Sequence, residues 1–296
     1  MVTFLVVNPA AFSNWHLYSS LLMTLPVAIF LAVPLVFVVT AGDMGLSFPA
    51  TMGLSALVFA KLVVAGHDPF LALAAALVGG VSLGFLVGTL VVHANLSALI
   101  ATLGMNFVLR GLVMILTEAK SISLHDLDQT LFHKLLSGFA AGVPVQIYWA
   151  IGFGVAAGIL YRHQRFGVHL HIVGDNPHGA LRVGINVKRV RVGAFVFMGL
   201  GAALAGVFST LINLTWWPTT GDGYLLPVLA SVFVGGTPFW GGSGTAFGGA
   251  IGALIVTFIQ TAVVAAGLSG YYVQLVSGVI IILSLFGHRW SLIRYR

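Results

Sequence analysis

The chain has 296 residues, of which 59% are apolar and 7% are charged. A soluble domain carries about 25% charged residues, so this composition excludes a water-soluble globule and favours a protein embedded in lipid. The sequence contains no cysteine, which excludes a disulfide framework and thiolate chemistry. The net charge is +6, and in a membrane protein the placement of basic residues along the chain indicates the orientation. We therefore expect no nucleic acid partner.

Apolar runs close to the 20 residues that cross a bilayer predict nine membrane segments. These runs lack the alternation of polar and apolar residues that is typical of barrel strands. We therefore expect an all-α, polytopic membrane bundle that forms one transmembrane domain over residues 1–296, with short or broken helices near its centre. The predicted segments are residues 19–40, 48–65, 70–93, 96–117, 145–161, 192–214, 226–239, 245–267 and 271–287.

Basic residues gather in one loop and in the C-terminal tail. Residues 162–191 contain six Lys or Arg and a single acid, Asp175. Loops rich in Lys and Arg face the cytoplasm, so we expect this loop and the C-terminus on that side. Residues 118–144 form the longest loop on the opposite, outer side.

A short helix is predicted within the basic loop, over residues 178–183. Asp175 or Asn176 is a plausible N-cap, Pro177 suits the first helical position, and Gly184 suits the position after the end. A short capped helix on this face suits docking into another protein. An ordinary basic loop fits the same residues equally well.

Two glycine-containing stretches, residues 40–47 and 235–244, interrupt apolar sequence. Non-helical backbone at membrane depth is tolerated only against protein or a wet cavity, so these breaks indicate a transport pathway. Both lie in hairpins of the same sense, which hints at an internal parallel repeat. The first stretch fits an ordinary turn as well, whereas the five glycines of the second are harder to explain in that way.

Polar residues also lie inside the predicted segments. Thr102, Asn106 and Arg110 recur every four residues and so share one helical face. Charged groups at such depth usually face a bundle interior or a cavity, although Arg110 would also satisfy backbone carbonyls. Other polar residues within the segments are Lys61, Gln260 and Gln274.

Several kinds of chemistry find little support in the sequence. No GxxxxGK[ST] loop is present, so energy from ATP would have to come from a partner. The histidines of residues 162–191 lack companions at a recognised ligand spacing, so we expect no metal. Residues 241–244 have the GxSG form of an intramembrane serine protease, with Ser243 as nucleophile and His288 as base, which makes a protease a remote alternative.

Taken together, these features resemble the permease (transmembrane) subunits of ribose- and galactose-type ABC sugar importers, the branched binding-protein-dependent permease family. The resemblance covers about residues 8–285. Asp43, Leu46 and Ser47 resemble that family's Gly-Gly-Ile-Asp-Leu-Ser turn. The other matching motifs are ATLGMNFVLRG at 101–111, GDNPHGA at 174–180, GINVKR at 184–189 and VGGTPFWGGSG at 234–244.

The resemblance implies a translocation subunit that is not itself an enzyme and that moves a monosaccharide or similar small polar solute into the cytoplasm. It implies a bacterial inner membrane location. ATP and Mg would bind a separate ABC ATPase, and this chain would bind no cofactor. A periplasmic substrate-binding protein and a second permease, either a copy or a paralogue, are the further implied partners.

The resemblance also assigns residues. The loop 162–191 would hold the helix that couples the chain to the ATPase, and the breaks would line the pathway. The expected coupling residues are Gly174, Asn176, Pro177, Ala180, Gly184, Ile185 and Asn186. The expected pathway residues are Asp43, Ser47, Thr102, Asn106, Arg110, Gly235, Gly236, Thr237 and Gly242.

A self-contained secondary transporter or channel is the leading alternative of another class. The identity of the solute and the choice between homodimer and heterodimer stay open. Members of the family usually carry one more span upstream, and residues 3–7 resemble a stub of it. We therefore expect the native gene product to extend upstream of Met1 by a hydrophobic segment.

Overall fold

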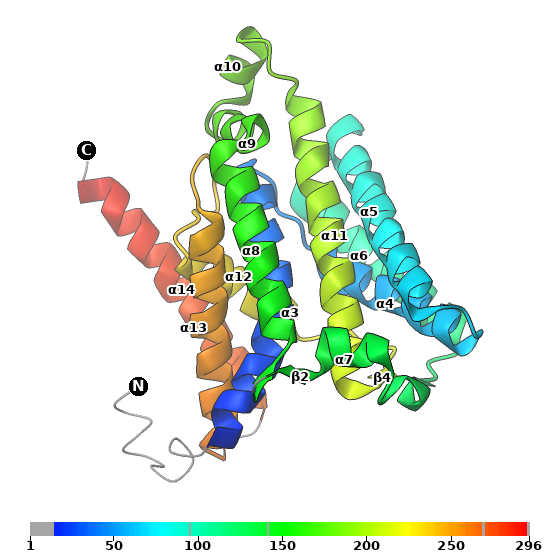
Figure 1. Ribbon diagram of the computed structural model, residues 1–296. Coiled ribbons are helices and arrows are strands. Elements are labelled where there is room, and N and C mark those ends of the chain that lie inside the picture. The colour runs from blue at the N-terminus through cyan, green and yellow to red at the C-terminus, as the bar shows by residue number, and fades with distance from the viewer. Residues whose placement is uncertain (1–14, 95, 141, 268–269, 295–296) are drawn as a thin grey trace.

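The computed structural model describes residues 15–94, 96–140, 142–267 and 270–294, so the stub at 3–7 lies outside the described residues. Figure 1 shows a bundle of helices with no large sheet, which confirms the predicted all-α membrane fold. The helices are α3 (Trp15–Thr40), α4 (Phe48–Val64), α5 (Pro69–His93), α6 (Ala98–Thr117), α7 (Leu131–Ser137), α8 (Gln146–His163), α9 (Arg165–Asp175), α10 (Pro177–Arg182), α11 (Val187–Asn213), α12 (Leu225–Val234), α13 (Ala246–Ala265) and α14 (Tyr271–Arg294).

The bundle has two distinct ends (Figure 1), which we name the α10 end and the α7 end after the short helix that each carries. Two short antiparallel strand pairs accompany α7; the first ties the loop 118–144 to the segment after α11, and the second lies within the loop 118–144. These elements are β1 (Ile122–Ser123) paired with β4 (Thr215–Trp216), β2 (Phe139–Ala140) paired with β3 (Val143–Pro144), and the 3₁₀ helix η1 (His125–Leu127).

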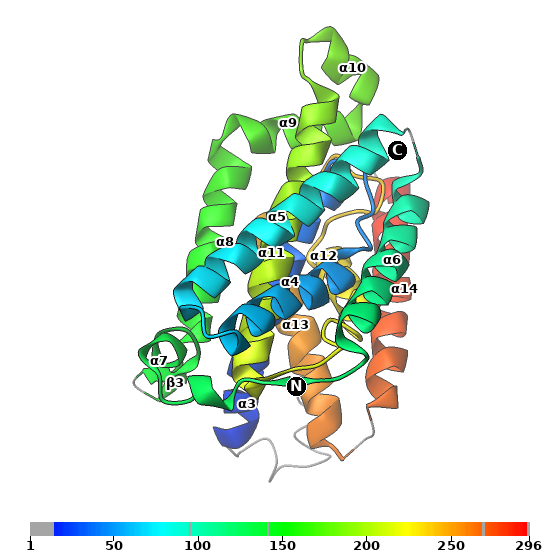
Figure 2. The same cartoon turned by 90° about the vertical axis from the view of Figure 1, so that its right-hand side faces the viewer.

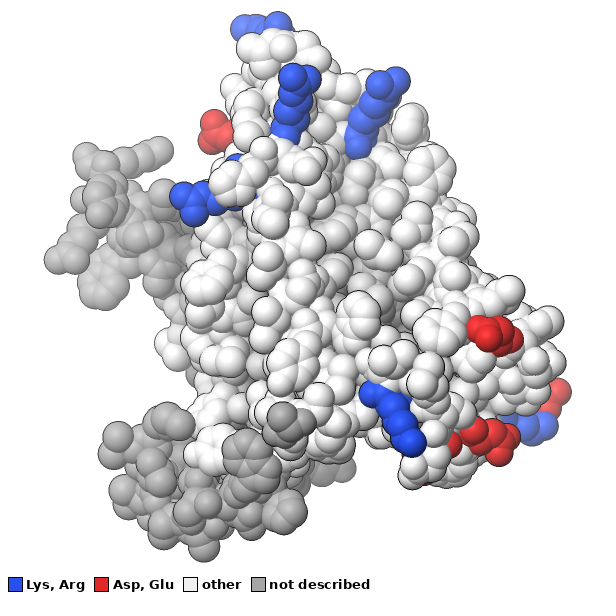
Figure 3. Space-filling model, in the orientation of Figure 1, with Lys and Arg blue, Asp and Glu red and all other residues white. Residues whose placement is uncertain are grey.

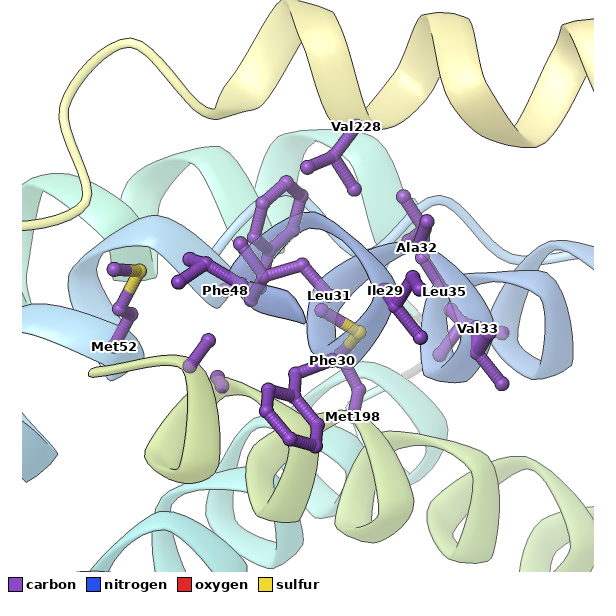
Figure 4. Close-up of a cluster of buried hydrophobic side chains, with 14 of the residues drawn as sticks. Ile29, Phe30, Leu31, Ala32, Val33, Leu35, Phe48, Met52, Met198 and Val228 are labelled. Carbon is purple, nitrogen blue, oxygen red and sulfur yellow. The ribbon is translucent and has the colours of Figure 1, made fainter. Parts of the chain in front are cut away.

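Helix α3 is the centre of the bundle. Over its apolar span Leu17–Thr40, 83% of the residues in the most apolar window are buried, because α8, α11, α12 and α13 all pack against it. Figure 4 shows side chains of α3 in one buried cluster with Phe48 and Met52 of α4, Met198 of α11 and Val228 of α12. A helix that is apolar all round belongs in a core or in lipid, and α3 occupies the core.

The outer helices keep much of their apolar surface exposed. Helix α6 is buried over only 17% of its most apolar window, and Figure 2 shows it at the side of the bundle. Among the described residues, five helices are long and apolar enough to cross a membrane. Their exposed apolar faces match a lipid environment, in which no charge is needed on the surface.

Each predicted segment coincides with a helix, but some predicted ends are wrong. Helix α12 stops at Val234 instead of residue 239, because Gly236 adopts a φ of +88°, which ends a helix. With 10 residues, α12 spans about 15 Å, half of a bilayer core. Helix α11 begins at Val187 instead of residue 192, because the Asn186 side chain caps it by accepting the Arg189 N–H. Helix α9 was not predicted.

Helices α5 and α11 cross at a contact between glycines. A Cβ on Gly80 would lie 2.5 Å from the carbonyl oxygen of Gly199, so the two backbones touch with no side chain between them. Neighbouring Gly79 faces open space. Small residues at such crossings let membrane helices pack closely by van der Waals contact.

We expect Gly80→Ala to push α5 and α11 apart and to destabilise the protein, since overpacking a tight contact costs about 1–3 kcal/mol. Gly79→Ala is the matched control, and its better helix propensity should leave the melting temperature unchanged or slightly raised. Thermal unfolding of the detergent-solubilised variants measures both. Equal melting temperatures for the two variants would contradict the packing described here.

Candidate functional site

Helix α10 starts with a side-chain cap at the α10 end of the bundle. Asn176 Oδ1 accepts the backbone N–H of Gly179 at 2.9 Å, and Pro177 opens the first turn, where no N–H donor is needed. Asn176, one of the two residues predicted as the cap, is therefore the cap observed. The helix runs from Pro177 to Arg182, one residue earlier than predicted.

The other end of α10 closes in a Schellman motif. Gly184 adopts a φ of +81°, as predicted for the residue that ends the helix. The Ile185 N–H donates to the Ala180 carbonyl at 3.0 Å, and both side chains are buried beneath the helix. Two apolar side chains on the opposite side remain in the open: Leu181 is 58% exposed and Val183 is 70% exposed.

Three distant segments of backbone meet beneath α9 and α10. The Gly242 N–H donates to the Thr40 carbonyl at 2.9 Å, and a Cβ on Gly174 would overlap that same carbonyl oxygen. A Cβ on Gly241 would lie 2.8 Å from the Cα of Gly42. We call this contact of residues 40–42, 174–175 and 241–242 the glycine junction. It joins both predicted breaks to the end of α9.

Side chains around the glycine junction add polar ties. Thr40 Oγ1 and the Tyr161 hydroxyl lie 2.7 Å apart in a buried hydrogen bond. His171 Nδ1 lies 3.1 Å from the Gly242 carbonyl oxygen. Thr237 is fully buried, and its Oγ1 has no hydrogen-bond partner among the described residues. Helices α8 and α9 are thereby fastened to both breaks.

An ion pair connects the first break with α11. Arg191 donates from Nε to Asp43 Oδ2 at 2.6 Å, and its Nη2 contacts Asp43 Oδ1 in the second half of a bidentate pair. Asp43 is only 3% exposed. Arg191 lies in the second turn of α11, shortly after α10, so the pair links the start of α11 to the first break. The sequence prediction for Asp43 missed this partner.

Thr102 of α6 holds the first break from the other side. Its Oγ1 accepts the Leu46 N–H at 3.0 Å, and its hydroxyl donates toward the Ala98 carbonyl at 2.7 Å. Ser47 is buried at the N-terminus of α4, where its carbonyl accepts from Thr51 Oγ1. The Leu46 N–H and the Ser47 carbonyl thus find partners within the protein, which non-helical backbone needs at membrane depth.

A cavity of about 290 Å³ lies between α6, α14 and the starts of α4 and α12. We call it the polar cavity. Arg110 forms an ion pair with Asp222 at its wall. A larger cavity of about 690 Å³ shares Asp222 with it and continues between α3, α12 and α13. The polar cavity is lined by Pro49, Asn106, Arg110, Gly221, Asp222, Gly223, Leu225, Leu226, Pro227, Val273, Gln274 and Ser277.

The predicted pathway residues therefore lie in three places. Asn106 and Arg110 line the polar cavity, and Asp43, Ser47 and Thr102 fix the first break. The remaining four, Gly235, Gly236, Thr237 and Gly242, form the second break, outside the two cavities described above. Among polar residues noted in the segments, Gln274 lines the polar cavity, Gln260 lines the larger one, and Lys61 donates to the Leu116 carbonyl at 3.0 Å.

Charge is distributed unevenly between the two ends. Figure 3 shows Lys and Arg side chains gathered around the α10 end and most acidic side chains near the α7 end. Asp175 is the acid at the α10 end, and Lys120 and Lys134 are the bases of the opposite loop. Of the protease pair, the His288 side chain lies outside the described residues. No cluster of three or more metal-ligating side chains occurs in the part of the chain that the structure describes.

A bundle with apolar outer faces, two broken helices and a polar cavity between them is a membrane transport protein. The sequence family described as the permease component of branched-chain amino acid transport systems matches residues 17–285. The chain belongs to this family, which confirms the resemblance seen in its motifs and makes it a permease subunit.

Individual relatives are similar over most of the chain. The ribose import permease protein of Escherichia coli is 32% identical over 94% of this chain and 87% of its own length. The D-allose transport system permease protein of the same species is 34% identical, covering 83% and 75%. The L-arabinose ABC transporter permease protein of Azospirillum brasilense is 30% identical, covering 86% and 74%. No solved structure matches the chain.

We expect Asp43→Asn to destabilise the protein strongly, because removing one partner of a buried pair leaves the other charge uncompensated, at a cost of about 3–5 kcal/mol. Arg191 keeps some exposure, so the lower end of that range is expected. The control is Glu118→Gln, which breaks the exposed pair with Lys120 and should change stability by less than about 1 kcal/mol. Denaturant unfolding in detergent compares the two, and equal losses would contradict the role given to the pair.

Proposed function

We propose that the chain is the permease subunit of an ABC importer that moves a monosaccharide or similar small polar solute into the cytoplasm. The observation that carries this proposal is its similarity, over most of its length, to the permease proteins for ribose, D-allose and L-arabinose. The polar cavity between broken helices suits such a solute, since hydroxyl groups need hydrogen-bonding partners inside a membrane.

The exposed tip of α10 is the proposed docking point for the ATPase. Leu181 and Val183 present apolar side chains beside a basic surface, and burying them against a partner would be favourable. The cap at Asn176 and the Schellman turn at Gly184 hold α10 as a rigid unit. A rigid helix can transmit a push from its partner.

The glycine junction is the proposed route of transmission. Because Gly174 touches both breaks with no intervening side chain, a displacement of α9 and α10 would move the two broken segments together. The ion pair of Asp43 with Arg191 would carry the same motion along α11. ATP-driven closure of the ATPase would in this way switch the pathway between its inward-open and outward-open forms, without chemical change to the solute.

The charge asymmetry supports a location in the bacterial inner membrane with the α10 end in the cytoplasm. The C-terminus would lie on the same side. A periplasmic substrate-binding protein would deliver solute at the α7 end, and a second permease, a copy or a paralogue, would complete the pathway. ATP and Mg would bind the ATPase, with no cofactor on this chain and no catalysis by it.

We expect Leu181→Asp to abolish copurification of the ABC ATPase with the tagged chain, since a charge in an apolar contact is costly to bury. Leu131→Asp is the matched control: it changes a leucine at the α7 end that is somewhat more exposed than Leu181, and it should leave copurification intact. Affinity purification followed by an ATPase assay measures both. Retention of the ATPase by the Leu181 variant would exclude α10 as the docking point.

The alternative of a self-contained secondary transporter is tested in liposomes. The purified chain alone should not accumulate D-ribose, D-allose or L-arabinose under an imposed Na⁺ or H⁺ gradient. The same chain reconstituted with its ATPase and binding protein should take up sugar when ATP is supplied. Gradient-driven accumulation by the chain alone would overturn the ABC assignment.

A further inference from the structure

We infer that the polar cavity is a solute-binding subsite for uncharged polyhydroxylated molecules of monosaccharide size, with Asn106, Gln274 and the ion pair of Arg110 with Asp222 as its recognition groups. This inference rests on the proposed function and deepens it. It assigns two residues, Asp222 and Gln274, that the family resemblance did not supply.

The side chain of Asn106 carries the first argument. Its Oδ1 is buried, and among the described residues no donor reaches it. A buried acceptor without a partner costs about 1–3 kcal/mol, so native proteins keep such groups mainly where water or a ligand completes them. Asn106 lines the polar cavity, but its Oδ1 atom is itself covered by protein, so the side-chain amide has to turn toward the cavity for a solute hydroxyl to supply the missing donor.

The ion pair of Arg110 with Asp222 supplies the second argument. Arg110 is mostly buried, whereas the Asp222 side chain is about half exposed and lines both cavities. A carboxylate accepts several hydrogen bonds and a guanidinium donates five, so the pair still has capacity for solute hydroxyls. Because the two charges cancel, the subsite favours a neutral solute over an anion.

The depth of the cavity is the third argument. Helix α6 has 20 residues and a length of about 30 Å. Counted from its start at Ala98, Asn106 lies about 12 Å along it and Arg110 about 18 Å. Transporters bind their solutes near the middle of the bilayer, at the termini of discontinuous helices. Residues from the starts of the short helices α4 and α12 line this same cavity.

The size of the cavity sets the class of solute. Its volume of about 290 Å³ lies near the lower end of the range of roughly 300–1,000 Å³ that small-molecule pockets occupy. One sugar ring fits this space and a chain of several rings does not. The larger cavity that shares Asp222 with it offers a continuation beside α3, so solute would pass Asp222 between the two.

The test compares Asn106→Leu with Asn213→Leu, the same replacement at an exposed position at the end of α11. Equilibrium dialysis measures binding of tritiated D-ribose, D-allose and L-arabinose to the full chain purified in nanodiscs. We expect the Asn106 variant to bind the preferred sugar at least tenfold more weakly than the wild type, and the Asn213 variant to match the wild type. D-gluconate, an anion, should bind the wild type at least tenfold more weakly than the preferred sugar.

Gln274→Leu is the second variant, to be used should Asn106→Leu fail to fold, and we expect the same tenfold loss of sugar affinity from it. Gln274→Asn keeps the amide and should restore part of that affinity. Unchanged sugar affinity in a folded cavity variant overturns the subsite, as does equal weakening in the Asn213 variant. No measurable binding of any of the three sugars to the wild type also overturns it.

The same variants in the reconstituted complex separate this inference from the proposed function. We expect the number of sugar molecules moved per ATP hydrolysed to fall at least tenfold for Asn106→Leu and to stay at the wild-type value for Asn213→Leu. Sugar binding that depends on Asn106 without any ATP-driven uptake by the wild type would leave the subsite standing and overturn the ABC assignment. ATP-driven uptake that is unchanged in both cavity variants would overturn the subsite and leave the ABC assignment standing.

Discussion

The contact between Gly174 and the Thr40 carbonyl is the constraint on which the rest of the structure depends. Any side chain at Gly174 would overlap that oxygen, so only a glycine at this position lets the end of α9 sit directly on the end of α3. The second break reaches the same point through the Gly242 N–H. Three segments that are distant in sequence thus share one small volume, where the ends of α3 and α9 and the second break are in direct backbone contact.

Around this fixed point most of the polar groups described above fall into two sets, and buried Thr237, whose Oγ1 has no partner among the described residues, belongs to neither. One set, with Asp43, Arg191, Thr40, Tyr161 and Thr102, is satisfied within the protein and holds the breaks in place. The other set lines the polar cavity and includes an acceptor that lacks a protein partner. Polar groups that are fully paired give rigidity, whereas groups left with spare capacity can bind something else. The structure therefore separates the parts that hold the breaks from the parts that can meet a solute.

The sequence predicted the membrane class, the nine segments and the capped helix because these depend on local patterns: runs of apolar residues, a capping Asn, and a glycine after the helix end. The partners of the predicted polar residues could not be predicted. Asp43 pairs with Arg191 and Arg110 with Asp222 across long stretches of chain, and no spacing rule connects residues that only tertiary packing brings together. In the sequence Arg191 indicates only the orientation of its loop, and the early end of α12 depends on the backbone conformation of Gly236.

The burial of α3 has a consequence for how the protein is assembled. The helices that pack most extensively against α3, namely α8, α11, α12 and α13, come later in the chain. When α3 leaves the ribosome, its future neighbours have not been synthesised, yet it is long and apolar enough to remain in the bilayer by itself. Helix α3 must therefore exchange lipid contacts for protein contacts after the C-terminal half has been synthesised. The helix at the core of the bundle is thus the first of the described helices to be made and among the last to be enclosed by its neighbours.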